Sequence, residues 1–264
     1  MLNYKTIENK SSSQWVVFIH GAGGSYRVWF KQIRDFSKHY NLLLLDLRGH
    51  GESIKKKTKE KSKKYTIMEI ANDVVELLKS LNLKQCHLVG LSLGSIVNRE
   101  IAERNKELVK SMIMTGAVIK YNFRSKTLVW IANKSKYVVP YLWLYKIYAH
   151  IFMPLKKHKE SRKLFVAESL KITRNEFMNW MTLNSGLNKV LSKHWESEPE
   201  IPTLYVMGEN DYIFLPQVRL YLNNHCKYSS LSIVSDAGHI CNIDQSEAYN
   251  NIAINFLDKI IQES

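Results

Sequence analysis

Short, continuous apolar segments alternate with segments of helical periodicity along most of this chain, and this alternation restricts its fold more than any other feature. Continuous apolar runs are typical of strands covered on both faces, as in a parallel sheet. The sequence therefore predicts buried strands at residues 15–19 (WVVFI), 40–46, 85–90 and 111–117, and further strands at 202–208 and 230–234.

Helical patterns lie between these runs, and the clearest begins after Thr66. Thr66 and Glu69 have the spacing of a capping box, in which a hydroxyl and a carboxylate satisfy the first free amides of a helix. Apolar residues then follow at helical spacing, namely Ile67, Ile70, Ala71, Val74, Leu77, Leu78 and Leu81. A closing amphipathic helix is predicted at 245–261. Strands that alternate with helices of this length indicate an α/β fold with a mostly parallel central sheet flanked by helices.

The alternation stops near residue 119 and resumes at residue 202. Residues 119–198 are helix-like, basic and aromatic, and they hold four of the six tryptophans, Trp130, Trp143, Trp180 and Trp195. The length of 264 residues suits one large domain with an inserted part. We therefore expect an α/β core formed by residues 1–118 and 199–264, with residues 119–198 inserted as a helical cap, or lid.

The positive charge of the chain is concentrated in two segments. The net charge is +14, of which residues 55–64 (KKKTKEKSKK) carry +6 and residues 119–198 carry +10, so the rest is close to neutral. Such a surface can attract nucleic acid, anionic lipid or acidic substrates, or it can be a solvated lysine-rich surface with no partner. No zinc finger, RNA-binding signature or basic recognition helix accompanies the charge, and we expect no nucleic-acid partner.

The cysteine content and the length of the apolar segments indicate the cellular compartment of the protein. Cys86, Cys226 and Cys241 are odd in number and have no CxxC spacing, which argues against a disulfide framework or a cysteine zinc site. The N-terminus has no stretch that resembles a secretion signal, and no uncharged apolar run is long enough to span a membrane. The sequence predicts a soluble, cytoplasmic globular protein without metal or organic cofactor.

The pentapeptide Gly90-Leu91-Ser92-Leu93-Gly94 fits G-x-S-x-G at the junction of a predicted strand and a predicted helix. A sharp turn there places strained dihedral angles on Ser92, and the flanking glycines, Gly90 and Gly94, permit close backbone approach. The serine hydroxyl is lifted to the carboxyl end of the sheet, where the amides of the following helix point at developing negative charge. Ser92 is therefore the candidate nucleophile.

A glycine-rich segment, His20-Gly21-Ala22-Gly23-Gly24, directly follows the first apolar run. Small residues there let a backbone amide face the nucleophile, and we expect the amides of Ala22 and Leu93 to form an oxyanion hole. The alternative is a glycine-rich turn or a weak phosphate loop, although the Lys-Ser/Thr of a P-loop is missing.

A serine nucleophile needs a base and a group that orients the base. Asp211 follows the strand predicted at 202–208, and His239 follows the last strand, so both lie at the edge of the sheet where sites form. His239 is the candidate base and Asp211 the orienting carboxylate. Cys241, two residues beyond His239, is interpreted as a buried small hydrophobe rather than a functional thiol.

Several motifs together resemble those of the α/β-hydrolase fold superfamily. They are HGAGG with Trp29 downstream, DLRGHGES at 46–53, GLSLG, GENDYIF and DAGHICNID, and they span nearly the whole chain. The resemblance implies Ser92 as nucleophile, Asp211 as acid and His239 as base, with residues 119–198 in the position of the family's cap. Many relatives continue the serine motif with Met and a second Gly, where this chain has Leu93 and Ser95. A serine nucleophile argues against the chemistry of epoxide hydrolases and haloalkane dehalogenases.

The apolar and aromatic segment 137–155 (YVVPYLWLYKIYAHIFMPL) is interrupted by Pro140, Lys146 and His150. As a cap helix it would put aromatic faces over the site and form an apolar pocket; it could also pack with no ligand role. A third interpretation is an interfacial helix near anionic lipid, because aromatic residues with flanking lysines suit a headgroup boundary. The pocket residues expected are Leu91, Trp143, Trp180, Ile213 and Ile240.

These features predict a serine hydrolase that cleaves small-molecule carboxylic esters with an apolar acyl group through an acyl-enzyme, as carboxylesterases and lipases do. The same side chains can serve thioesters, lactones, C–C bond hydrolysis or perhydrolysis. A slow-turnover protein that binds a ligand or partner on a hydrolase scaffold is a further alternative. The sequence specifies no oligomeric state.

Overall fold

The computed structural model describes residues 1–55 and 65–263. In this part of the chain a seven-stranded sheet has the order β1-β3-β2-β4-β5-β6-β7. Every pairing is parallel except that of β1 with β3, so the expected mostly parallel sheet is confirmed. The strands are β1 (Asn3–Ile7), β2 (Trp15–Ile19), β3 (Asn41–Asp46), β4 (Cys86–Leu91), β5 (Val109–Thr115), β6 (Thr203–Gly208) and β7 (Ser229–Val234).

Six of these strands coincide with the predicted strands, with ends that differ by at most two residues. The seventh, β1, was not predicted. Its sequence, NYKTI, has no buried residue and lies at the antiparallel edge of the sheet, where one side of a strand faces solvent. An edge strand of this kind lacks the continuous apolar run that identifies the buried strands.

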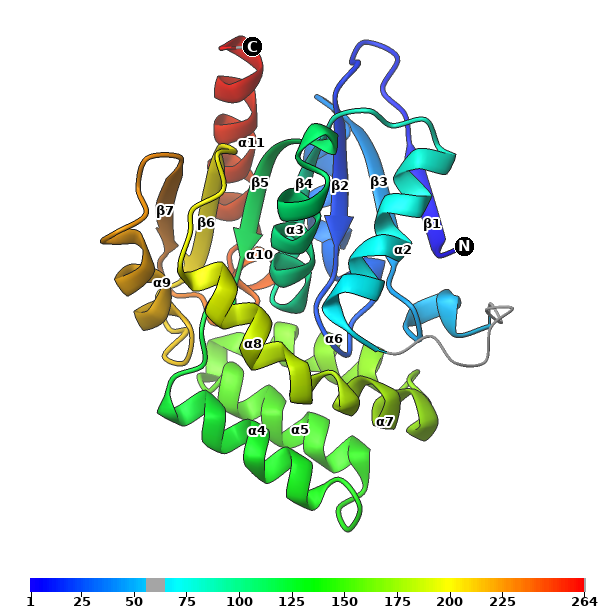
Figure 1. Ribbon diagram of the computed structural model, residues 1–264, viewed down its shortest axis with the longest axis vertical. Coiled ribbons are helices and arrows are strands. Elements are labelled where there is room, and N and C mark those ends of the chain that lie inside the picture. The colour runs from blue at the N-terminus through cyan, green and yellow to red at the C-terminus, as the bar shows by residue number, and fades with distance from the viewer. Residues whose placement is uncertain (56–64, 264) are drawn as a thin grey trace.

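Helices cover both faces of the sheet (Figure 1). In β2, Val17 and Ile19 pack in one core cluster with helices α2 (Ile67–Ser80) and α3 (Leu93–Arg104). The neighbouring side chains of β2, Val16 and Phe18, pack in a second cluster on the opposite face. This two-sided burial explains why the strand is apolar at every position.

The remaining elements of the core follow the same division. Helix α9 (Leu215–Leu222) joins the first cluster, whereas α1 (Phe30–Phe36), α10 (Cys241–Asp244) and α11 (Ser246–Gln262) join the second. Helix α2 begins as predicted, because the Thr66 hydroxyl accepts a hydrogen bond from the Glu69 amide (3.2 Å). Short 3₁₀ helices occur at Tyr26–Trp29, Gly51–Lys55, Lys106–Leu108 and Lys156–His158.

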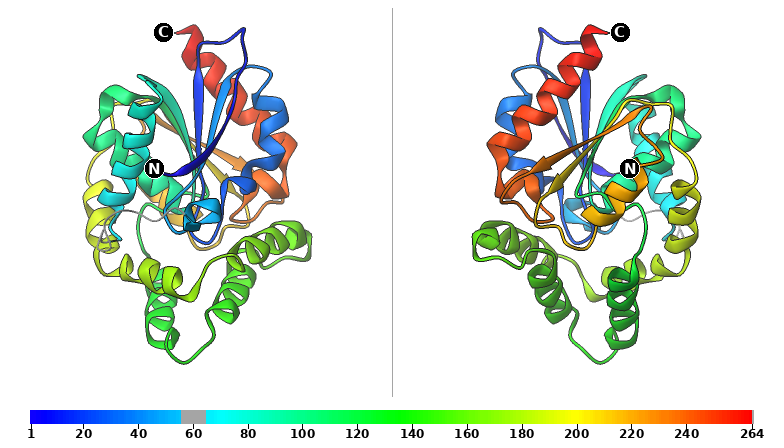
Figure 2. Two further views of the ribbon diagram at one scale, coloured as in Figure 1. Left: turned by 90° about the vertical axis from the view of Figure 1, so that its right-hand side faces the viewer. Right: turned by 90° about the vertical axis from the view of Figure 1, so that its left-hand side faces the viewer.

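Between β5 and β6 the chain leaves the sheet and forms a helical segment, which we define as residues 119–198. It contains α4 (Phe123–Ser135), α5 (Tyr141–Phe152), α6 (Lys159–Ser169), α7 (Arg174–Thr182) and α8 (Asn184–Trp195). Figures 1 and 2 show that α4 and α5 lie beyond the carboxyl ends of the strands, and that the turn between them is farthest from the sheet. The carboxyl ends of the strands and these helices therefore face each other.

Two sequence expectations concern charge and membranes. The predicted basic loop at 55–64 lies, apart from Lys55, outside the described residues. Of the helices that the structure does describe, none has the length and apolarity needed to cross a bilayer. The cytoplasmic location stays a prediction.

Candidate active site

Ser92 occupies a strained turn between β4 and α3. Its backbone has φ 53° and ψ −113°, in a region that non-glycine residues rarely adopt. Glycines on both sides allow this turn, because a β-carbon on Gly90 would lie 2.5 Å from the Gly94 carbonyl, and one on Gly94 would lie 2.2 Å from the Ile19 oxygen. Close contact between backbones thus fixes the position of the serine at the carboxyl edge of the sheet.

Ser95, the residue that departs from the family's usual pattern, supports the same turn. Its hydroxyl donates a hydrogen bond to the Ser92 carbonyl oxygen (2.6 Å) and accepts one from the Val118 amide (3.3 Å). The Ser92 amide in turn donates to the Thr115 carbonyl at the end of β5 (2.9 Å). The polar side chain at position 95 therefore links the serine turn to the chain that leads into the helical segment.

The structure brings Ser92, His239 and Asp211 together in a hydrogen-bonded line. His239 Nε2 lies 3.0 Å from Ser92 Oγ, and His239 Nδ1 lies 2.7 Å from Asp211 Oδ2. Both His239 and Asp211 are buried. An ionised carboxylate can only accept hydrogen bonds, so the ring proton of His239 lies on Nδ1, which faces Asp211. Nε2 of His239 is then unprotonated and can accept the hydroxyl proton of Ser92.

The surroundings of His239 fix its ring. The rings of Phe152 and Phe214 lie 5.3 and 5.1 Å from the imidazole, and the His239 amide donates to the Phe152 carbonyl (3.4 Å). Asp211 is held by a hydrogen bond from the Phe214 amide to its other oxygen (3.1 Å). Phe152 comes from α5, so the helical segment contacts the histidine directly.

Two backbone amides beside Ser92 are available to a ligand. Leu93 is the first residue of α3, and Ala22 lies in the loop after β2; both line the cavity described below. No hydrogen bond within residues 1–55 and 65–263 uses either amide. The oxyanion hole expected from these two amides stays a prediction; the amino end of α3, whose dipole favours negative charge, lies at the same place.

Two buried histidines hold the loop that carries Ala22. His20 Nε2 accepts a hydrogen bond from the Leu47 amide (3.0 Å), so its Nδ1 donates to the Gly21 carbonyl (2.7 Å). His50 Nε2 accepts from the Gly23 amide (3.0 Å) at a left-handed φ of 79°. Burial lowers the pKa of His20 to about 4 and that of His50 to about 3, so both rings are neutral at pH 7.

The helical segment packs on this loop. The Tyr145 ring of α5 lies so close to Gly23 that a β-carbon there would come within 2.8 Å of it. Trp180 of α7 donates from Nε1 to the Arg48 carbonyl (3.2 Å), and its ring meets that of His50 edge-on at 4.6 Å. Helices α5 and α7 of the helical segment therefore pack against the loop that carries Ala22 and against the neighbouring residues Arg48 and His50.

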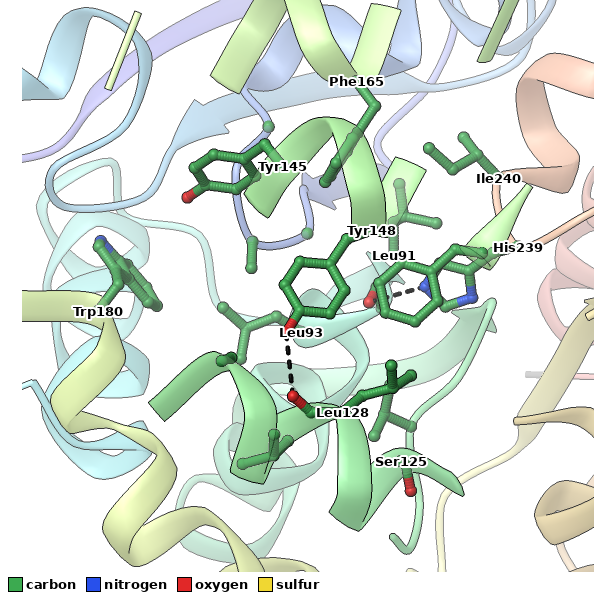
Figure 3. Close-up of a pocket in the computed structure, with 18 of the residues that line it drawn as sticks. Leu91, Leu93, Ser125, Leu128, Tyr145, Tyr148, Phe165, Trp180, His239 and Ile240 are labelled. Atoms are coloured by element: carbon green, nitrogen blue, oxygen red, sulfur yellow. Dashed lines mark hydrogen bonds between the residues drawn. The ribbon is translucent and has the colours of Figure 1, made fainter. Parts of the chain in front are cut away.

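A cavity of about 250 Å³ opens beside Ser92 between the sheet edge and the helical segment (Figure 3). Most of its lining is aliphatic or aromatic, and no lysine or arginine is among the described residues that form it. Glu168 is the one carboxylate in this lining, and it already accepts hydrogen bonds from Ser25 Oγ (2.6 Å) and Lys171 Nζ (2.5 Å). The lining of the cavity is thus mostly apolar.

Three of the five predicted pocket residues, Leu91, Trp180 and Ile240, line this cavity. The prediction for Trp143 is wrong, because its side chain is 62% exposed on the outer side of α5. Ile213 is buried, but it is not among the lining residues; its carbonyl accepts from the Asn122 amide group (2.8 Å) instead. On α5 the lining comes from Leu144, Tyr145 and Tyr148, the face opposite to Trp143.

Sequence reasoning missed most of the lining from the helical segment. The missed residues are Tyr121, Ser125, Leu128, Val129, Ala132, Leu144, Tyr145, Tyr148, Phe152, Leu164, Phe165, Glu168, Phe177, Met181, Leu183 and Leu187. On α4 the lining residues recur at intervals of three and four, which is the periodicity of one helix face. That periodicity marks a buried face, but it does not distinguish a cavity lining from ordinary packing.

Cys241 is buried as predicted, and burial raises the pKa of its thiol.

Within residues 1–55 and 65–263, three or more His, Cys, Asp or Glu side chains nowhere gather in an arrangement that could hold a metal ion.

Comparisons with known proteins bear on the fold. The profile of a family described as "alpha/beta hydrolase fold" matches residues 14–246. The (E)-2-((N-methylformamido)methylene)succinate hydrolase of Acinetobacter baylyi is 24% identical over 243 residues, with 89% of this chain and 87% of that protein covered.

Many solved structures are similar to this one, and two of them serve as examples. MenH from S. aureus superposes with a TM-score of 0.79 at 19% identity, covering 98% of this chain and 99% of that one. A meta-cleavage product hydrolase from Pseudomonas fluorescens superposes with a TM-score of 0.77 at 20% identity, covering 98% and 94%. At these identities the likeness concerns the fold alone.

Proposed function

The chain belongs to the α/β-hydrolase fold family, and from this premise we propose that it is a serine hydrolase that cleaves carboxylic esters with an uncharged, apolar acyl group. One observation carries the proposal. The hydrogen-bonded line of Ser92, His239 and Asp211 ends at an apolar cavity, with two free amides beside the serine.

In the proposed reaction, Ser92 Oγ attacks the ester carbonyl while His239 Nε2 takes the hydroxyl proton. Asp211 keeps the imidazole oriented and stabilises its charged form. As the tetrahedral intermediate collapses, the C–O bond to the alcohol breaks and His239 returns its proton to the leaving oxygen. Water, activated by the same histidine, then attacks the acyl-enzyme and releases the carboxylic acid, which restores Ser92.

Negative charge on the carbonyl oxygen would be stabilised by the amides of Ala22 and Leu93. A donor of this kind is worth about 100- to 1000-fold in kcat. The loop with Ala22 must be held rigidly for that purpose, and the hydrogen bonds from His20 and to His50 supply such rigidity. Neutral histidines suit this role, because a protonated His50 could not accept from the Gly23 amide.

The character of the acyl group follows from the cavity lining. A carboxylate in the acyl chain would lose its hydration without meeting a cation, since the described lining has no lysine or arginine. The relative from Acinetobacter is named for a succinate, which is a dicarboxylic substrate. We therefore place the substrate of this chain in a different class, that of esters whose acyl part is uncharged.

The helical segment would act as the cap of this enzyme. It supplies more than half of the cavity lining and contacts His239 through Phe152 and the oxyanion loop through Tyr145. Its residues would select the acyl group, while the core, residues 1–118 and 199–264, would carry out the reaction.

Labelling with a fluorophosphonate probe tests the proposal, because such probes modify activated serines. Wild type and the control Ser80→Ala, changed at an exposed serine of α2, should label equally, and Ser92→Ala should not label at all. Labelling of Ser92→Ala at the wild-type rate would contradict the nucleophile assignment. A folded wild-type protein that takes up no label would contradict catalysis and favour a ligand-binding role.

A further inference from the structure

Helices α4 and α5 are apolar on two opposite faces, and the proposed function accounts for only one of them. The inner face lines the cavity through Leu128, Ala132, Leu144 and Tyr148, among others. A helix on the surface of a globular protein normally has a polar outer face. The outer faces of these helices are different, and they require a separate explanation.

The exposed apolar residues of these outer faces lie mostly around the turn between the two helices. We define the hairpin tip as residues 130–143, which join the end of α4 to the start of α5. It exposes Trp130 (62%), Tyr137 (67%), Val138 (86%), Trp143 (62%) and Ile131. Isolated exposed apolar residues are common, but five within fourteen residues are a mark of an interaction surface.

Charge around the hairpin tip has a single sign. Residues 119–159 contain nine lysines and arginines and no aspartate or glutamate. Lys134 is exposed near the end of α4, and Lys136 Nζ lies 5.2 Å from the Tyr137 ring. On α5, Lys146 Nζ lies 5.8 Å from the exposed Trp143 ring. Aromatic rings with lysines directly beside them are typical of segments that lie at a lipid headgroup boundary.

The shape of the molecule makes this surface accessible. The turn between α4 and α5 projects beyond every other element on that side of the molecule (Figure 2). A flat partner can therefore touch the hairpin tip without meeting the sheet or the helices that cover it.

We propose that the hairpin tip docks on anionic lipid bilayers, with its aromatic and aliphatic side chains in the headgroup region and its lysines against the lipid charge. The charge argues against a second copy of this chain as the occupant. Two such tips would bring like charges together, and residues 119–159 offer no carboxylate to pair with them.

Docking of this kind would place the cavity next to the membrane. The inner faces of α4 and α5 line the cavity, so these two helices would lie between the cavity and a bilayer from which an apolar ester enters. This consequence depends on the proposed esterase function, whereas the docking itself does not involve Ser92.

Co-sedimentation with vesicles tests the proposal. The wild-type chain should pellet with vesicles of equal parts phosphatidylcholine and phosphatidylglycerol, less so at high salt, and it should stay in solution with phosphatidylcholine alone. Lys134→Gln together with Lys136→Gln should weaken binding by roughly tenfold or more, at about 1 kcal/mol for each lysine. Lys79→Gln together with Lys84→Gln, the matched change at the far end of α2, should leave binding within about twofold.

A second pair of variants tests the apolar part. Tyr137→Ser together with Val138→Ser should weaken binding by roughly tenfold, since the apolar area that enters the headgroup region is lost. Leu220→Ser, an exposed leucine of α9, is the control and should bind as wild type. Circular dichroism establishes that each variant is folded.

Equal pelleting with both vesicle types, or equal binding by the hairpin-tip and control variants, would overturn the proposal. A folded wild-type protein that does not bind vesicles would overturn the proposal as well. If that protein self-associates and the variant Tyr137→Ser with Val138→Ser does not, the surface would be assigned to contact with a second copy of the chain. Ser92→Ala should bind vesicles as wild type does. That variant therefore distinguishes a failure of docking from a failure of the proposed catalysis.

Discussion

The carboxyl edge of the sheet and the helical segment meet at one cavity, but they are built on different principles. At the sheet edge, Ser92, Asp211 and His239 follow strands β4, β6 and β7 and are held by hydrogen bonds. In the helical segment the side chains that face the cavity are mostly apolar and are held by packing. A position fixed by hydrogen bonds in a buried site tolerates little movement, whereas an apolar lining can change its shape at modest cost.

This difference assigns separate tasks to the two regions. The sheet edge would determine which reaction occurs, and the helical segment would determine which acyl group enters and where the protein resides. Polar contacts also join the two regions, among them Trp180 Nε1 with the Arg48 carbonyl, Ser25 Oγ with Glu168 and the Tyr65 hydroxyl with Glu176. Substitutions on the two sides should therefore differ in kind as well as in size.

The largest expected effect is at the sheet edge. Asp211→Asn should lower kcat for a p-nitrophenyl ester by about 10⁴-fold with little change in fold, because the amide favours the wrong tautomer of His239. Steady-state kinetics and circular dichroism measure both quantities. Asp236→Asn, at an exposed aspartate in the same loop as His239, should keep wild-type activity. A kcat for Asp211→Asn within a few-fold of the wild-type value would remove Asp211 from the catalytic group.

The next effect concerns the loop with Ala22. His50→Ala should lower kcat by roughly 10- to 100-fold with a smaller change in KM, because the Gly23 amide loses its acceptor and the oxyanion amide beside it loses its orientation. His50→Gln, which retains an acceptor, should recover part of the loss. His39→Ala at an exposed histidine is the matched control. A loss that appears in KM alone would assign His50 to substrate binding instead.

A change in the helical segment should alter selectivity and leave the chemistry intact. Ala132→Leu, in the cavity lining of α4, should reduce kcat/KM for the longest accepted acyl chains by about tenfold and shift the optimum to shorter chains. Ala167→Leu, at an exposed position of α6, should leave the chain-length profile unchanged. An unaltered profile for Ala132→Leu would mean that the acyl group does not lie along α4.

The smallest expected effect is on stability as a function of pH. Burial lowers the pKa of His20 to about 4 and that of His50 to about 3, so the unfolded chain binds more protons than the folded chain below pH 6.5. The free energy of unfolding should therefore fall as the pH drops from about 6.5 toward 4, by about 1 kcal/mol per pH unit for each histidine. Urea unfolding of His50→Gln should show a shallower dependence than His39→Gln. Identical slopes would contradict the assignment of His50 as a buried neutral ring.

Sequence alone could predict the sheet and the candidate catalytic residues, for one shared reason. Buried parallel strands are continuous apolar runs, and Ser92 and Asp211 each follow such a run. His239 follows β7, a more polar strand (SSLSIV) at the end of the sheet order. The positions of all three residues therefore come from strand ends that the sequence indicates. Strand β1 was not predicted, because its sequence at the sheet edge lacks a continuous apolar run.

The cavity lining could not be predicted in the same way. It depends on how α4 and α5 rotate about their own axes, and both helices have apolar residues on both faces. Trp143 and Tyr145 are only two positions apart, yet the first is exposed and the second lines the cavity. The hydrogen bonds of His50 were likewise hidden, because its partner Gly23 lies 27 residues away.

The most direct test of the account offers the enzyme two esters of equal chain length at once. We would mix the wild-type chain with equimolar p-nitrophenyl hexanoate and mono-p-nitrophenyl adipate, quench with acid, and measure the intact mass and the modified peptide. We expect a hexanoyl group on Ser92 and no adipoyl group, because the described cavity lining has no cation for the second carboxylate. Adipoyl modification in excess, or acylation at a residue other than Ser92, would contradict it.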